Sequence, residues 1–434
     1  MATPGAPTVD VTQALFDEAS DGLGLHTPGT LRATGMSLNS LRRGNRRAGI
    51  ARVGSVALVE RNGVLQWELG PAQAGRQDQR RMRTRWGLLG RLIGRKEFVA
   101  LEPNEIGKYL EELDQQLTPT RGLRQWDASG NVLTSTPAVT KDGNILLIIH
   151  GTFSKSDHLF EDLRKAPNGL DFLGRAAKHY KQILSFDHPT VSVSSMLNAL
   201  DLRNALGESA GPVDIVCHSR GGLVARWWME ALDPFPGRTR RCVFVASPLR
   251  GTSLASPPRL RAGLNALANL SRLLGTAGMA IPLMKAPAAI LRVIGSVVGV
   301  ASKTPLVDAA VAMIPGLASQ SLTSNNSELN RLNGQTQNAQ YFFVRSDFQN
   351  TSVGWDIFRF IRETKIRTAE AAADLLVFPG QNDLVVDFDS MTWVPGITPG
   401  PGNLFDFGTN DDVYHTNYFE KEGTVDFIGR ALGV

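Results

Sequence analysis

The 434-residue chain contains only two cysteines, Cys217 and Cys242. Both lie in apolar, strand-like stretches, so we expect two small buried side chains rather than a disulfide. No cluster of residues has metal-ligand spacing, and the phosphate-binding pattern G-x-x-x-x-G-K is absent. We therefore expect chemistry that uses neither a metal nor a cofactor.

Long uncharged apolar runs are also absent. The most apolar region, residues 273–302, is interrupted by Pro282, Lys285 and Arg292. Its longest uncharged stretch is shorter than the roughly 20 residues that span a bilayer. The N-terminal Met1–Pro7 shows neither the basic nor the apolar region of a secretory signal. These features predict no signal peptide and no transmembrane segment, which favours a cytoplasmic location.

Acidic residues are missing between Asp21 and Glu60, although the net charge of the chain is only +5. The same stretch carries Arg32, Arg42, Arg43, Arg46, Arg47 and Arg52. A second basic cluster spans residues 76–96. Neither cluster has the interleaved aromatic residues that stack on bases, so we expect solvated faces rather than a nucleic-acid site. Peripheral contact with an anionic membrane surface is a weaker alternative, and the sequence does not identify protein partners.

The remaining composition is that of a folded protein, with 42% hydrophobic and 20% charged residues. The length suits one large α/β domain with an extension, or two to three domains. Residues 1–48 are rich in Gly, Thr, Pro and Arg and show little periodicity. We interpret them as a flexible basic arm, with one or two helical turns at residues 11–17.

Residues 49–140 predict a small β-rich extension. Apolar stretches at residues 52–60 and 64–69 flank an Asn-Gly pair at residues 62–63. This pair is typical of a tight hairpin turn, because both residue types accept positive φ angles. A helix is predicted near residues 105–117. The strands of this extension would lie at the edge of a larger sheet.

From residue 141 to the C-terminus, predicted strands alternate with predicted helices, which indicates a mostly parallel sheet flanked by helices. The strands are predicted at residues 144–150, 182–187, 213–218, 241–246, 340–345 and 373–378. Between residues 256 and 319 this alternation stops, and a helical segment rich in Ala, Leu, Gly and Val follows. We interpret this insertion either as a helical hairpin packed in the core or as a mobile apolar cap over a pocket.

Residues 213–226 predict a strand that runs directly into a small-residue turn and then a helix. Ser219 lies at the turn in the sequence Cys-His-Ser-Arg-Gly, where Cys217 replaces the first glycine of the pattern G-x-S-x-G. A serine at such a turn exposes its Oγ beyond the carboxyl end of the strand, and the following N–H groups point to the same space. Ser219 is therefore the candidate nucleophile.

A serine hydroxyl needs a general base and a carboxylate that orients the base. Of the seven histidines, only His415 follows Ser219, and in the chain order Ser, Asp or Glu, His the base comes last. Asp383 lies in a Gly- and Asn-rich turn after the strand predicted at residues 373–378, and is the preferred acid. The alternatives are Asp387, Asp389 and, more remotely, Asp347.

Acyl transfer also needs N–H groups that bind the developing oxyanion, commonly worth ~3 kcal/mol each. The main-chain N–H of Arg220, next to Ser219, is one candidate. The other is expected in the segment His-Gly-Thr-Phe at residues 150–153, where Gly151 permits a turn and Thr152 supplies its N–H. Because both donors belong to the main chain, replacing the Thr152 side chain would test packing rather than donation.

On these motifs the chain resembles α/β-hydrolases of the lipase and esterase kind. The segments that carry the resemblance within residues 141–434 are His150–Thr152, Cys217–Gly222, Ser247–Thr252, Ser327–Asn333 and Asn382–Val386. The resemblance implies an α/β-hydrolase fold in which the insertion at residues 256–319 is a helical cap over an acyl pocket.

The expected function is a serine hydrolase that cleaves carboxylic esters, with lipid-like acyl esters as substrates. Ser219, His415 and Asp383 would form the catalytic triad, and the main-chain N–H groups of Thr152 and Arg220 the oxyanion hole. An acyltransferase or a thioesterase with the same triad is an alternative. A non-catalytic binding or effector module that uses the Arg-rich N-terminal region is another.

Overall fold

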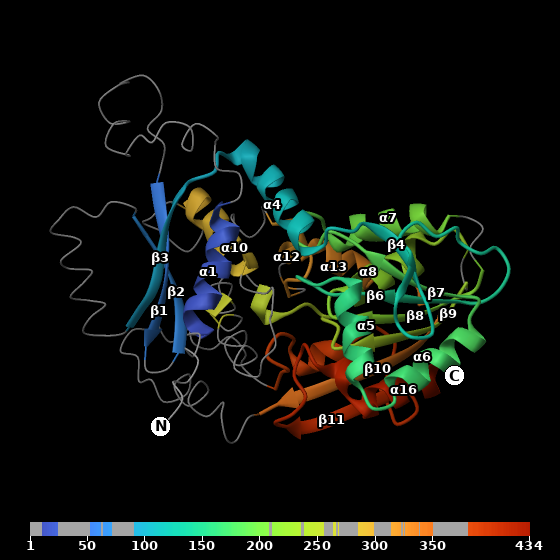
Figure 1. Ribbon diagram of the computed structural model, residues 1–434. Helices are drawn as coiled ribbons and strands as arrows, with labels where there is room; N and C mark the ends of the chain where they lie inside the picture. The colour runs from blue at the N-terminus through green and yellow to red at the C-terminus, as the bar shows by residue number, and fades with distance from the viewer. Residues whose placement is uncertain are drawn as a thin grey trace, which may run out of the picture. The chain divides into compact units, whose positions relative to one another are not determined.

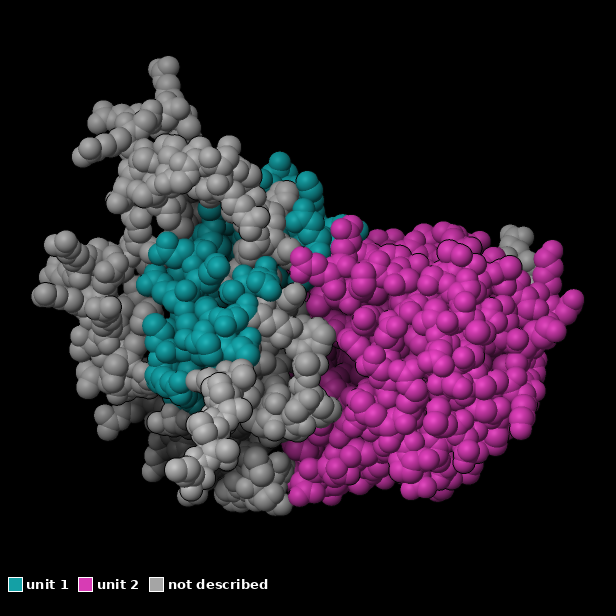
Figure 2. Space-filling model, viewed as in Figure 1, with its two compact units in different colours: residues 1–113, 264–313 teal, residues 114–263, 314–434 magenta. Residues whose placement is uncertain are grey.

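The computed structural model describes residues 11–24, 53–61, 64–71, 91–207, 211–235, 238–255, 264–265, 268, 285–298, 314–322, 324, 326–337, 339–349 and 381–434. The chain divides into two compact units, which Figure 2 shows in different colours. Unit 1 comprises Met1–Leu113 and Leu264–Met313, and unit 2 comprises Asp114–Gly263 and Ile314–Val434.

Unit 1 contains a three-stranded antiparallel sheet in the order β2-β1-β3 (Figure 1). Its strands are β1 (Val53–Arg61), β2 (Val64–Pro71) and β3 (Arg91–Val99). The predicted hairpin is confirmed, because β1 and β2 pair from Gly54↔Pro71 to Arg61↔Val64. The two residues of its turn lie outside the described residues. The third strand, β3, is not predicted by the sequence.

Two helices from distant parts of the sequence pack together in unit 1. Helix α1 (Val11–Gly24) contacts β3 and α10 (Lys285–Val298), and α10 also contacts β1. At Gly94 of β3 an added Cβ would lie only 2.3 Å from the Phe16 ring of α1, so this position requires glycine. The region expected to be a flexible arm, residues 1–48, therefore contains a longer helix than the one or two turns predicted there.

Helix α10 is the longest described part of the insertion at residues 256–319. Arg292 of this helix is buried and donates hydrogen bonds from Nε and Nη2 to the Val99 carbonyl at 3.2 and 3.0 Å. The guanidinium also lies 4.8 Å from the centre of the Tyr109 ring. These contacts lie within unit 1. Much of the insertion lies outside the described residues, so the cap stays a prediction.

Unit 2 is built on an eight-stranded sheet in the order β11-β10-β9-β8-β6-β7-β4-β5 (Figure 1). The strands are β4 (Gly122–Trp126), β5 (Val132–Thr134), β6 (Ile145–Ile149), β7 (Gln182–Asp187), β8 (Val213–His218), β9 (Thr239–Val245), β10 (Gln340–Phe348) and β11 (Leu404–Asn410). Neighbouring strands from β11 to β7 are parallel, whereas β4 and β5 pair antiparallel at one edge.

Helices cover both faces of this sheet, because the central strands are apolar on both sides. In β6, Ile145, Leu147 and Ile149 pack into one core, and Leu146 and Ile148 pack into another. On the first face lie α7 (Ser195–Leu206), α8 (Gly221–Arg226), the π-helix η2 (Trp227–Leu232) and α13 (Ser327–Leu332). On the second lie α5 (Ser156–Lys165), α6 (Gly169–His179) and α16 (Glu422–Leu432). The predicted mostly parallel sheet flanked by helices is confirmed.

Short helical turns complete unit 2. They are η3 (Ser253–Ala255), α12 (Pro315–Ala318), η7 (Phe388–Thr392) and η8 (Tyr418–Glu420). The strand predicted at residues 373–378 lies outside the described residues. Strands β4 and β5, from the expected extension at residues 49–140, join the large sheet as edge strands. The boundary between the units falls within α4 (Pro103–Leu117), upstream of the expected boundary at residue 140.

A buried carboxylate in the last turn of α4 anchors the loop that follows β7. Asp114 accepts hydrogen bonds from the main-chain N–H groups of Thr190, Val191 and Ser192 at 2.7, 3.0 and 2.6 Å. The Ser192 hydroxyl donates to the same carboxylate at 2.6 Å. An acceptor without hydrogens suits this site, because every neighbouring polar group donates.

We expect Asp114→Asn to lower the free energy of unfolding by about 2–4 kcal/mol, because its amide NH₂ would face main-chain N–H groups that then lose their acceptor. Urea denaturation followed by tryptophan fluorescence measures the change. The control is Asp201→Asn on the exposed side of α7, which should stay within about 0.5 kcal/mol of the wild type. Equal midpoints for the two variants would contradict the assignment.

Candidate active site

Ser219 lies at the junction between β8 and α8 in a left-handed conformation with φ of 52°. This conformation is costly for a residue other than glycine, so the surroundings must hold it. Its N–H donates to the Val245 carbonyl of β9 at 2.9 Å. A Cβ at Gly221 would lie 2.5 Å from the Ile149 carbonyl, and one at Gly222 would lie 2.4 Å from Ser247 Oγ. The turn therefore requires both glycines.

Cys217 occupies the position of the first glycine in the serine motif. Its side chain is completely buried, and its thiol lies 3.4 Å from the Val243 carbonyl. The Cys217 and Cys242 sulfur atoms are 4.0 Å apart, and both thiols are free. The prediction of two small buried side chains is confirmed, and the turn accommodates cysteine in place of glycine.

The structure brings together the three residues predicted for the triad. His415 Nε2 lies 2.9 Å from Ser219 Oγ, and His415 Nδ1 lies 2.8 Å from Asp383 Oδ2. All three side chains are buried. Because a carboxylate only accepts, Nδ1 carries the proton and Nε2 is left as the acceptor for the serine hydroxyl. This tautomer is the one that can remove a proton from serine.

Asp383 is held by its own turn. Its Oδ1 accepts from the main-chain N–H groups of Val385 and Val386 at 3.1 and 2.8 Å. Its Oδ2 also accepts from the hydroxyl of Tyr418 at 3.2 Å. Burial, reinforced by the Asp383 charge, raises the pKa of Tyr418 well above its ordinary value, so the phenol stays protonated and donates. Tyr418 carries no sequence signal that distinguishes it from a core aromatic residue.

The alternative acids have other partners. The Asp387 carboxylate accepts from the main-chain N–H and the hydroxyl of Ser253 at 2.7 and 2.9 Å. Asp347 is buried and accepts from the side chains of Gln349, Gln381 and Thr409. Asp389 is exposed. Among the described aspartates, only Asp383 bonds to His415.

A second histidine, His218, binds the main chain of His415. His218 donates from Nε2 to the main-chain carbonyl of His415 at 2.8 Å, and the two ring centres are 4.9 Å apart. Burial, reinforced by the proximity of His415, lowers the pKa of His218 to about 3. His218 is therefore neutral and cannot compete with His415 for a proton near neutral pH.

Of the residues that carry the two predicted oxyanion donors, Arg220 directly follows Ser219 and Thr152 directly follows Gly151. Gly151 packs directly against the nucleophile, since a Cβ on it would lie 2.7 Å from Ser219 Cβ. The Thr152 hydroxyl donates to Gln320 Oε1 at 3.0 Å, so the side chain has a partner of its own. Within the described residues, no hydrogen bond uses the main-chain N–H of Thr152 or of Arg220. Both groups are thus free to bind a substrate oxygen.

The Arg220 side chain fixes the elbow to the loop before α7. It is fully buried, and Nη2 donates to the Val193 carbonyl and to Asn198 Oδ1, both at 2.6 Å. Burial lowers the pKa of Arg220 to about 10, with Asp114 and Glu328 opposing the shift. The guanidinium remains charged at neutral pH. Its role is structural, whereas its main-chain N–H belongs to the candidate site.

Gly151→Ala should disrupt the elbow, because the new methyl group overlaps Ser219 Cβ. We expect the free energy of unfolding to fall by about 1–3 kcal/mol and labelling of Ser219 by a fluorophosphonate to slow by at least about tenfold. The control is Gly174→Ala in α6, where a Cβ meets nothing within 4 Å. This variant should gain about 0.5–1 kcal/mol and label normally. Labelling of Gly151→Ala at the wild-type rate would refute the close approach.

No curated protein matches. Among solved structures, the chain is similar to the mature lipase BlEst2 of Bacillus licheniformis, at 15% identity and a TM-score of 0.35, covering 68% of this chain and 94% of that chain. Lipase 1 of Pelosinus fermentans matches at 13% identity and a TM-score of 0.38, covering 67% and 98%. The carboxylesterase CesB of Bacillus subtilis matches at 10% identity and a TM-score of 0.30, covering 76% and 97%.

Within the described residues, no helix combines the length and apolar character that crossing a membrane requires.

A family model described as "Domain of unknown function (DUF7379)" matches residues 115–433. The match begins one residue after the start of unit 2 and includes Ser219, Asp383 and His415. Because it spans most of the sequence, the protein belongs to the DUF7379 family.

Proposed function

We propose that the protein is a serine hydrolase that cleaves carboxylic esters through an acyl-enzyme on Ser219. The observation that carries the proposal is the chain of hydrogen bonds from Ser219 Oγ through His415 to Asp383, at 2.9 and 2.8 Å. The serine is strained, lies at the end of a parallel strand and has unused main-chain N–H groups beside it. These features together favour a nucleophile over a structural serine.

In the first half of the reaction, Ser219 Oγ attacks the carbonyl carbon of the ester while His415 Nε2 takes the hydroxyl proton. The carbonyl oxygen becomes an oxyanion, which accepts hydrogen bonds from the main-chain N–H groups of Thr152 and Arg220. The imidazolium of His415 then gives its proton to the departing alkoxide. Cleavage of the ester C–O bond leaves the acyl group on Ser219.

In the second half, a water molecule attacks the acyl-enzyme. His415 accepts a proton from this water and returns a proton to Ser219 Oγ as the acid product leaves. Asp383 does not transfer a proton. Its hydrogen bonds to Val385, Val386 and Tyr418 hold Oδ2 opposite His415 Nδ1, so the ring keeps its orientation and the imidazolium is stabilised.

A lipid-like acyl group is the substrate that we favour. The insertion at residues 256–319 is rich in Ala, Leu, Gly and Val, and an apolar cap of this composition would favour an acyl chain over a polar substituent. Hydrolysis rates over a series of p-nitrophenyl esters test this choice. Rates that rise with acyl length are expected, and a preference for acetate would contradict it.

Ser219→Ala should remove both turnover of p-nitrophenyl esters and labelling by a fluorophosphonate, because no other hydroxyl lies on His415 Nε2 in the described structure. The variant should fold normally, since the methyl group fits where the hydroxymethyl group was. Turnover, gel-based labelling and circular dichroism measure these properties. Ser129→Ala, in an exposed turn, is the matched control and should keep both activities. Labelling that survives Ser219→Ala would disprove the assignment.

The choice of acid is tested by comparing Asp383→Asn with Asp387→Asn. The amide of Asp383→Asn favours the wrong tautomer of His415, so we expect kcat to fall by about 10⁴-fold. Asp387→Asn disturbs only the contact with Ser253, so kcat should stay within about tenfold of the wild type. Steady-state kinetics on one p-nitrophenyl ester measures both. The reverse order of the two losses would identify Asp387 as the acid.

A further inference from the structure

His150 is a buried histidine at the end of β6 that takes no part in the hydrogen-bond chain of Ser219. Its Nε2 accepts from the main-chain N–H of His188 at 3.2 Å. Because Nε2 is the acceptor, the proton of the neutral ring is on Nδ1. Nδ1 lies 2.9 Å from the Gly151 carbonyl and therefore donates to it. The two contacts define a single tautomer.

The carbonyl that His150 holds belongs to the same peptide group as the predicted oxyanion donor. The Gly151 carbonyl and the Thr152 N–H lie in one planar unit and, in a trans peptide, point in opposite directions. Fixing the carbonyl on one side therefore fixes the N–H on the other. Gly151 has no Cβ that would restrict rotation of this peptide, so an external hydrogen bond is needed to keep it in place.

We propose that His150 is a positioning residue for the oxyanion hole: its Nδ1–H holds the Gly151–Thr152 peptide so that the Thr152 N–H faces the substrate oxygen. The inference rests on the proposed function, since it assigns a role within the same reaction. It adds a side chain to a site whose donors are otherwise main-chain groups. Acceleration comes from donors that are already oriented before charge develops.

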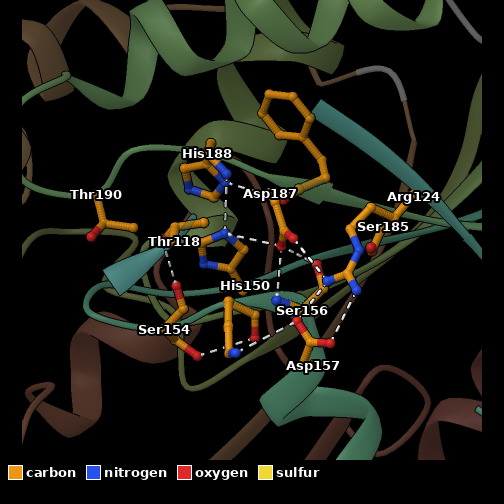
Figure 3. A network of polar contacts seen from close by, with 12 residues as sticks. Thr118, Arg124, His150, Ser154, Ser156, Asp157, Ser185, Asp187, His188 and Thr190 are labelled. Carbon is orange, nitrogen blue, oxygen red and sulfur yellow. Dashed lines mark hydrogen bonds and ion pairs between the residues drawn. The ribbon is translucent and has the colours of Figure 1, made fainter. Parts of the chain in front are cut away.

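The surroundings of His150 keep its ring from turning (Figure 3). The ring stacks on His188 with centres 4.2 Å apart, and His188 is itself held by donation from Nδ1 to the Phe186 carbonyl at 3.2 Å. The Asp187 carboxylate lies 3.6 Å from His150 Nε2. This distance is too long for a hydrogen bond, which agrees with an unprotonated Nε2.

Asp187 is occupied by other donors. It accepts from the Ser156 main-chain N–H and hydroxyl at 2.8 and 2.5 Å, and from Arg124 Nη1 at 3.0 Å. Arg124 also forms a bidentate pair with Asp157 at 2.6 and 3.0 Å. Figure 3 shows this network joining β4, β7 and α5 around the histidine. The Asp187 carboxylate thus has hydrogen-bond donors other than the imidazole of His150.

The electrostatic setting favours the neutral ring. Burial lowers the pKa of His150, an effect that the Arg220 charge reinforces and that Asp187 and the Gly151 hydrogen bond oppose. A protonated ring would direct a second N–H at the His188 N–H, which already donates to this nitrogen. The neutral ring with its proton on Nδ1 is therefore the stable form of His150 near neutral pH.

The test compares two variants that keep different halves of the imidazole. The amide nitrogen of His150→Asn can occupy the place of Nδ1 and donate to the Gly151 carbonyl. The amide of His150→Gln reaches the place of Nε2 and leaves that carbonyl without its donor. For a p-nitrophenyl ester we expect His150→Gln to lower kcat by about 10²-fold with little change in KM, and His150→Asn to retain most of kcat.

A matched thionoester separates positioning from a merely structural role. Its sulfur accepts hydrogen bonds weakly, so it gains little from the oxyanion hole. The ratio of the ester rate to the thionoester rate should fall in His150→Gln and be restored in His150→Asn. Both rates come from one preparation, so partial unfolding cancels in the ratio. A wild-type ratio in His150→Gln, or an equal fall in both variants, would overturn the role of the Nδ1–H.

The wild-type protein provides a second measurement that does not depend on how the variants fold. With ¹⁵N-labelled histidine, the ring nitrogens of His150 should report a proton on Nδ1, and a proton on Nε2 would overturn the inference. A wild-type protein without Ser219-dependent turnover of either ester would instead overturn the proposed function. An active wild type with an unchanged ratio in His150→Gln would leave the proposed function standing and remove only the role of His150.

Discussion

The candidate site depends on one steric constraint, which is the close approach of the ends of β6, β8 and β9. Ser219 keeps a positive φ because its N–H bonds to Val245 at the end of β9. Gly151 after β6 and Gly221 at the start of α8 have no room for a Cβ. Cys217, at the first position of the serine motif, has its side chain in the core, where the thiol lies 3.4 Å from the Val243 carbonyl of β9. This explains why Cys217 is tolerated there.

The sequence predicts those parts of the site that follow from chain order. Ser219 follows the recognisable strand β8, Asp383 follows the strand predicted at residues 373–378, and His415 is the only histidine after Ser219. The central strand β6 is recognised because both of its faces are buried and every residue is Ile or Leu. Edge strands such as β11, with Asp406 and Asn410 in its sequence, mix polar and apolar residues and give no such pattern. Tyr418 and His150 act through tertiary contacts that chain order does not specify.

Three buried aspartates organise the loops at the carboxyl edge of the sheet. Asp114 binds the loop after β7, Asp187 binds the start of α5, and Asp383 binds its own turn and His415. In each case the carboxylate accepts main-chain N–H groups, because an irregular loop that is buried has no ladder partner for them. The loops are therefore fixed before substrate arrives. Catalysis by oriented dipoles requires this rigidity. A loop that reorganised during the reaction would lose the rate acceleration that N–H groups already in position provide.

The histidines near the site differ in the hydrogen-bond partners of their ring nitrogens. His150, His188 and His218 each donate to a main-chain carbonyl, and burial lowers the pKa of all three. They serve as rigid neutral donors. His415 alone among the described histidines lies between a hydroxyl and a carboxylate, which is the arrangement that a general base for serine needs. Chain order selects His415 as the only histidine after Ser219. The hydrogen bonds select it independently, because His150, His188 and His218 each donate their ring proton to a main-chain carbonyl.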